Sequence, residues 1–114
     1  MKESGEYFGM SYEMLNEKLL ELQDEMIAAI QQNMRIESVK GEPLPDAPYG
    51  AGPKAALDDM LALGEKLGFR TGHADNRIGW IEYGDGEEMV GILGHIDVVP
   101  AGEGWKYPAY GAEI

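Results

Sequence analysis

Residues 91–105 read GILGHIDVVPAGEGW, and the prediction of the fold starts from how this stretch is interpreted. An apolar run ends there in His95 and Asp97, which stand two positions apart. Extended backbone sends alternate side chains to opposite faces, so these two side chains should project from the same face. The sequence therefore predicts a strand that carries a candidate site at its end.

Two further strand-like stretches precede this run, FRTGHADN at residues 69–76 and RIGWIEYG at residues 77–84. The third stretch, EEMVGILGH at residues 87–95, has a continuous apolar centre, which is typical of a strand covered on both faces. The dipeptide Asp85-Gly86 before it is suited to a tight turn. We expect a three-stranded mixed sheet with the third strand in a central position.

An amphipathic helix is predicted from Ser11 to about Arg35, with Ser11 as its N-cap. Its apolar residues recur every three or four positions, as a helix with one buried face requires. These residues are Leu15, Leu19, Leu22, Met26, Ile30 and Met34.

A second helix is predicted to begin near Pro53 and to stop at Gly68. Gly64 lies on its apolar face and leaves room for another backbone to come close. Between the helices, residues 38–53 are rich in proline and glycine and predict a long loop. This loop is either a wall beside a substrate or a tether. The predicted fold class is α/β, with two helices followed by the three-stranded sheet.

Composition limits the partners and the location that we expect. The 114 residues are the size of a single domain, and the net charge of −12 disfavours nucleic acid and anionic membrane surfaces as partners. No cysteine is present, which excludes disulfides and thiolate metal sites, and no run approaches the ~20 apolar residues of a membrane span. We expect a cytoplasmic protein whose residues 1–10 are flexible.

His95 and Asp97 allow two interpretations. The imidazole is a common zinc ligand, and its second ring nitrogen usually donates to a carboxylate such as that of Asp97. The alternative is a structural histidine that is hydrogen-bonded to a nearby acid. A catalytic zinc site takes three protein ligands, whereas the other histidine of this chain, His73, is expected to be exposed to solvent.

The wider sequence resembles a known family. GHIDVVPAGEGW, followed by YPAYGAEI, resembles the first metal-binding segment of zinc-dependent dipeptidases in the aminoacylase and carboxypeptidase superfamily, close to carnosinase-like and Xaa-His dipeptidases. Three upstream stretches, RIESVKGE, PYGAGP and NRIGWIEYG, are similar to the amino-terminal region of that family in the same order. The resemblance covers nearly all of residues 12–114, and GHIDVVP with GEGW is its most specific part.

This resemblance implies that His95 binds one zinc ion of a two-zinc site and that Asp97 is a catalytic-site residue that orients His95. It also implies that residues 1–114 are one partial domain, the amino-terminal part of a larger α/β/α catalytic domain that hydrolyses dipeptides with a metal-activated water. The bridging aspartate, the glutamate base and the other ligands would come from further along a longer chain. These 114 residues alone are then expected to be inactive.

Two other functions stay open. The acidic chain could be an inactive interaction module that forms homo-oligomers through open strand edges and uncovered apolar faces. It could also sequester a metal ion through His95, Asp97 and the abundant carboxylates.

Overall fold

The computed structural model describes residues 6, 7 and 9–114. The chain divides after Ile30 into two units, residues 1–30 and 31–114. The prediction that residues 1–10 are flexible falls partly outside the described residues. Among the described residues of this stretch, strand β1 (Glu6–Tyr7) pairs antiparallel with strand β2 (Met10–Ser11).

The predicted amphipathic helix is present, but as two helices, α1 (Tyr12–Glu21) and α2 (Gln23–Met34). Ser11 caps α1 as predicted, because its hydroxyl oxygen accepts the backbone N–H of Met14 at 3.2 Å. The prediction of one continuous helix is wrong at Leu22. Its N–H donates to the carbonyl of Leu19, three residues back, which is the tighter spacing of a 3₁₀ turn.

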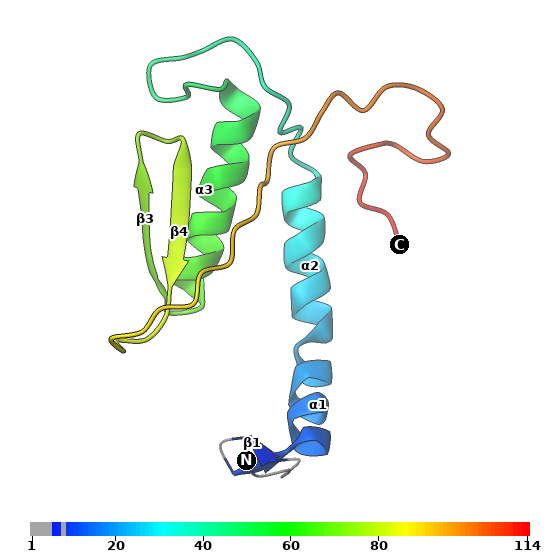
Figure 1. The fold of residues 1–114 in the computed structure, drawn as a ribbon. Helices are drawn as coiled ribbons and strands as arrows, with labels where there is room; N and C mark the ends of the chain where they lie inside the picture. Colours follow the sequence, from blue (N-terminus) through cyan, green and yellow to red (C-terminus); the bar gives the residue numbers. More distant parts are fainter. Residues whose placement is uncertain (1–5, 8) are drawn as a thin grey trace. The chain divides into compact units, whose positions relative to one another are not determined.

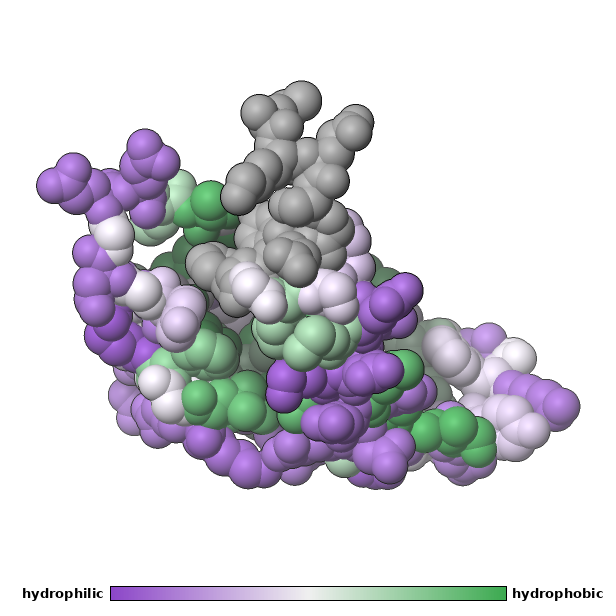
Figure 2. Space-filling model, turned by 90° about the horizontal axis from the view of Figure 1, so that it is seen from below, coloured by the Kyte–Doolittle hydropathy of each residue, from purple (hydrophilic) through white to green (hydrophobic). Residues whose placement is uncertain are grey.

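The apolar stripe of these two helices is not buried. Leu15 is half-buried, and the exposed fractions of the other five residues range from 49% at Ile30 to 57% at Met26. Figure 2 shows apolar side chains, in green, at the surface of the face that it presents. The periodicity therefore predicted helical structure in this region correctly, while most of the apolar stripe is exposed among the described residues.

The second unit is built around α3 (Ala51–Lys66), which packs against a β-hairpin (Figure 1). Gly64 of α3 is buried against the hairpin, where a Cβ atom would lie 2.9 Å from Thr71 Cγ2 and 3.0 Å from Ile81 Cδ1. The glycine thus makes room for side chains of both strands rather than for another backbone. The helix ends before Gly68, whose φ of 86° fits the left-handed conformation at a helix stop.

The hairpin pairs β3 (Arg70–Ala74) with β4 (Ile78–Glu82) in antiparallel register. Asp75 and Asn76 are the central residues of its turn, with φ values of 52° and 54°, and the N–H of Arg77 donates to the carbonyl of Ala74 at 2.9 Å. Residues 75–77 lie between the paired residues Ala74 and Ile78. Positive φ at both positions is the pattern of a type I′ turn, whose twist matches that of the flanking strands. The tight turn predicted at Asp85-Gly86, between the second and third strands, is not seen in the described structure.

The prediction of a third, central strand is not met in the described structure. Residues 83–97 have no strand pairing: the chain turns back after β4, bends at residues 87 and 88, and then runs on without a regular strand. The sheet beside α3 has two strands instead of three (Figure 1). Val90, Ile92 and Leu93 are 93%, 98% and 92% exposed. An apolar run becomes a central strand only where neighbours cover both of its faces and both of its edges, and the described residues do not provide them.

The core of the described chain is small. Its buried apolar residues are Ala47 and Ala56, and among the described residues no large side chain is fully buried. In the part of the chain that the structure covers, no helix is both long and apolar enough to cross a membrane.

Candidate functional site

His95 and Asp97 contact each other, as their spacing predicts. The imidazole Nδ1 lies 2.9 Å from the backbone carbonyl oxygen of Asp97 and 3.4 Å from its carboxylate Oδ1. The His95 side chain is 82% exposed. The two residues therefore form a local pair at the surface of the described chain.

This contact decides which ring nitrogen of His95 carries the proton. A carbonyl oxygen can only accept a hydrogen bond, so Nδ1 must be the donor in the bond to Asp97. In the neutral ring, Nε2 then keeps its lone pair and is the nitrogen that can bind a metal ion. The second nitrogen of a metal-binding histidine commonly donates to a carbonyl or a carboxylate in this way.

Ser38 holds the backbone on both sides of Asp97. Its hydroxyl donates to the carbonyl of Ile96 at 2.8 Å, and its own carbonyl accepts the N–H of Val98 at 3.2 Å. Val39 and Val98 form a parallel β-bridge at the same place. Sequence reasoning missed Ser38, because a single serine in a predicted loop carries no signal that it packs against residues 58 positions away.

An open groove of about 1220 Å³ extends from this pair along the second unit. Its walls are the apolar side of α3, strand β4 and the extended residues 86–97. The residues that line it include Leu61, Ile92, His95 and Asp97.

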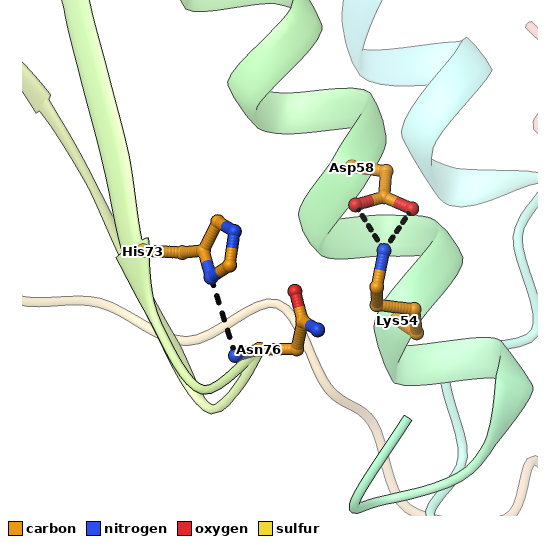
Figure 3. A network of polar contacts seen from close by, with 4 residues as sticks. All are labelled: Lys54, Asp58, His73 and Asn76. Atoms are coloured by element: carbon orange, nitrogen blue, oxygen red, sulfur yellow. Dashed lines mark hydrogen bonds and ion pairs between the residues drawn. The ribbon is translucent and has the colours of Figure 1, made fainter. Parts of the chain in front are cut away.

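His73 is exposed, as predicted, and takes part in the hairpin turn. Its Nδ1 accepts the backbone N–H of Asn76 at 3.3 Å (Figure 3). Because an N–H can only donate, the neutral His73 ring carries its proton on Nε2, the opposite arrangement to His95. His73 therefore has a local structural contact.

The described residues do not by themselves fit a zinc ion. A catalytic zinc site takes three protein ligands and keeps one open position. The structure has no group of three or more histidine, cysteine, aspartate or glutamate side chains placed to hold a metal, counted over the residues that it describes. His95 supplies one nitrogen, Nε2, whose lone pair is available for a metal ion. The other ligands of such a site would have to come from residues outside the described structure.

Comparison with known proteins relates the chain to dipeptidases. No family model matches it. A Staphylococcus epidermidis protein named "Putative dipeptidase" is 47% identical over 94 residues, 81% of this chain and 20% of that protein. The Bacillus subtilis protein "Putative dipeptidase YtjP" is 40% identical over 99 residues, 85% of this chain and 21% of that protein. A Staphylococcus aureus relative with the same type of name is 43% identical over 94 residues.

These relatives have names that agree with the family suggested by GHIDVVP and GEGW, and they support a dipeptidase relationship for most of this chain. The chain spans about a fifth of the length of the relatives that it matches. The similarity therefore concerns one part of a much larger protein.

Proposed function

We propose that this chain forms the amino-terminal part of the catalytic domain of a zinc-dependent dipeptidase. In this proposal His95 is a ligand of one of two zinc ions, and Asp97 is the catalytic-site residue that orients it. Segments that correspond to the other four fifths of the relatives would supply the remaining ligands and the general base. The observation that carries the proposal is the hydrogen bond from Nδ1 of His95 to the Asp97 carbonyl, which leaves Nε2 free to bind a metal ion. It occurs in a chain that is similar to proteins named dipeptidases.

The uncovered apolar surface supports the view that further protein completes this fold. Burying one exposed valine, leucine or isoleucine side chain contributes about 1.5–3 kcal/mol. Val90, Ile92 and Leu93 together would contribute about 4–9 kcal/mol, which is comparable to the whole stability of a small domain. A sequence that leaves this much stabilisation unused is better explained as one layer of a larger domain.

The groove supports the same view. Its volume of about 1220 Å³ exceeds the roughly 300–1,000 Å³ of a typical small-molecule pocket. It lies between β4 and the extended residues 86–97, and both have backbone available for strand pairing. Additional strands from the same domain would fit this place better than a dipeptide alone.

A chimeric enzyme tests the proposal. The matched segment of the Bacillus subtilis relative is replaced by this chain, and hydrolysis of a panel of dipeptides is measured beside the unmodified relative. We expect the chimera to hydrolyse the dipeptides that the relative accepts. We also expect a zinc chelator to abolish turnover and added zinc to restore it.

His95→Ala is the decisive variant of the chimera, and His73→Ala is its matched control. We expect His95→Ala to lower the activity at least 100-fold, because loss of a hydrogen-bond partner of a metal ligand already costs about 10–100-fold and loss of the ligand itself should cost more. His73→Ala should leave activity near that of the parent. An active His95→Ala chimera, or an inactive parent chimera that is folded, would contradict the proposed role.

A second candidate function is favoured by the same exposed apolar run. The chain on its own would then be an inactive acidic module that forms homo-oligomers through the extended residues 87–97 and the open sheet edges. Light scattering of the 114-residue chain tests this possibility. A dimer that is lost in Ile92→Asp supports it, and a monomer at all concentrations contradicts it.

A further inference from the structure

Ser38 differs from the other polar residues of the described chain because it is buried. It is 3% exposed, and it is the one buried polar side chain among the residues that the structure describes. Both of its oxygen atoms form hydrogen bonds to the segment that carries His95 and Asp97. We propose that Ser38 is a positioning residue that sets the backbone of Asp97 and, through it, the tautomer of His95.

The two hydrogen bonds of Ser38 act on the two peptide units that meet at the Cα of Asp97. The hydroxyl holds the unit before it, at the carbonyl of Ile96, and the Ser38 carbonyl holds the unit after it, at the N–H of Val98. Peptide units are planar, so φ and ψ of Asp97 are the only soft angles between them. Fixing both units therefore fixes the direction of the Cα–Cβ bond of Asp97 and of its backbone carbonyl.

The same arrangement links Ser38 to His95. The peptide unit whose N–H donates to Ser38 is the unit whose carbonyl accepts Nδ1–H of His95. A hydrogen bond at one end of a peptide unit polarises the other end and strengthens the acceptor there. This bond comes from the backbone carbonyl of Ser38 and is retained in any substitution, whereas the Ser38 hydroxyl acts on the preceding peptide unit, at the carbonyl of Ile96. By holding that unit, the hydroxyl keeps the Asp97 carbonyl in place to accept Nδ1–H of His95, which leaves Nε2 available as a ligand.

Neighbouring residues keep Ser38 in place. Gly52 in the first turn of α3 lies against the backbone of residues 37 and 38, and a Cβ atom at Gly52 would lie 3.3 Å from Ser38 Cα. The amino-terminal turn of α3 therefore backs the serine on one side, while the Ile96–Val98 segment lies on the other. A rigid helix is a better support for a site than a loop alone.

The tautomer itself can be measured by ¹⁵N NMR of the two imidazole rings in the 114-residue chain, at about pH 8.5 where histidine is neutral. The chain has two histidines, and His73 is an internal reference of the opposite tautomer. We expect His95 to be mainly Nδ1-protonated in the wild type. In Ser38→Ala the Nε2-protonated form should gain at least threefold in population, while His73 does not change.

Ser38→Thr retains the hydroxyl donor and should restore the wild-type tautomer of His95. Ser11→Ala is the matched control, because it removes a hydroxyl that caps α1 and does not contact residues 96–98. If Ser38→Ala does not fold, Ser38→Cys keeps the volume with a weaker donor and should give an intermediate population. An unchanged His95 tautomer in a folded Ser38→Ala or Ser38→Cys variant would overturn the proposal.

The catalytic consequence rests on the proposed function and is tested separately. In the active chimera, Ser38→Ala should lower kcat at least 10-fold with little change in KM, and Ser38→Thr should restore it. A tautomer change together with an inactive parent chimera would leave the positioning role in place and contradict the dipeptidase function. An active chimera whose Ser38→Ala variant has an unchanged His95 tautomer and an unchanged kcat would contradict the positioning role and leave the dipeptidase function in place.

Discussion

The β3–β4 hairpin and residues 87–97 have similar strand-forming sequences, but only the hairpin forms paired strands. The hairpin pairs residue by residue across its turn and is backed by α3. Residues 87–97 are more apolar, yet most of their side chains face solvent. The comparison teaches that local pattern creates the capacity for a strand, while a neighbouring edge and a covering layer decide whether it forms.

The largest effect should come from a glycine of α3, the helix that backs the hairpin, when it is compared with a glycine of residues 87–97. A methyl group at Gly52 would overlap the carbonyl oxygen of Glu37, which is backbone and cannot move aside cheaply. We expect Gly52→Ala to destabilise the chain by about 3 kcal/mol, more than the roughly 1 kcal/mol that alanine gains in helix propensity. Urea unfolding followed by circular dichroism measures this change.

Gly91→Ala is the control in the extended segment, where the added methyl group would meet no atom within 4 Å. Its unfolding free energy should stay within about 0.5 kcal/mol of the wild type. Equal losses at Gly52 and Gly91 would show that residues 87–97 are as tightly packed as α3.

Apolar truncation sharpens the same contrast. Leu61 of α3 contacts the hairpin near Gly79, so Leu61→Ala should lower the free energy of unfolding by about 2 kcal/mol, at the low end for a partly buried leucine.

Ile92→Ala should change the unfolding free energy of the 114-residue chain by less than about 0.5 kcal/mol, because Ile92 is already exposed to water. In the chimera, where we propose that Ile92 is covered, the same substitution should cost about 2 kcal/mol or more. A small effect in both proteins would mean that this run is never buried.

The hairpin turn gives a smaller effect. Asn76 has a φ of 54°, and a β-branched side chain is poorly tolerated in that conformation. Asn76→Val should therefore destabilise the hairpin by about 1–2 kcal/mol in thermal or urea unfolding. Asn76→Gly, which accepts positive φ freely, should be no less stable than the wild type. If valine is tolerated as well as glycine, the turn is not of the type described.

The exposed ion pair on α3 should give the smallest effect. Lys54 Nζ lies 2.6 and 2.5 Å from the two carboxylate oxygens of Asp58, one helical turn away (Figure 3). Because both side chains are accessible to solvent, Asp58→Asn should cost no more than about 0.3–0.5 kcal/mol. The difference from wild type should shrink when urea unfolding is repeated in 1 M salt. A loss that does not respond to salt would point to packing instead of charge.

Sequence reasoning predicted the elements that depend on local chemistry. The cap at Ser11, the helix stop at Gly68 and the two strands of the hairpin are all present because each is decided by a few neighbouring residues. The contact of His95 with Asp97 follows from alternation along an extended chain. The turn predicted at Asp85-Gly86 is absent because it was to join the second strand to a third strand that does not form.

Features that depend on distant contacts could not be predicted. A third strand would need neighbours that the described residues do not supply, and the apolar pattern of residues 87–95 says nothing about whether such neighbours are present. Ser38 acquires its role only when the chain brings residues 38 and 96–98 together. A buried serine is recognised from its burial and its partners, and neither can be read from a single sequence.

The exposed apolar run Met89–Leu93 affects the tendency of the chain to aggregate with copies of itself. Short segments rich in β-branched and apolar residues are the kind that stack into cross-β fibrils when their backbone is accessible. Glu87 and Glu88 stand directly before Met89–Leu93, and Asp97 follows it closely. Charged residues at such flanks act as gatekeepers against fibril growth, and the net charge of −12 adds repulsion between chains. The acidity of this protein therefore protects the very segment that its fold leaves uncovered.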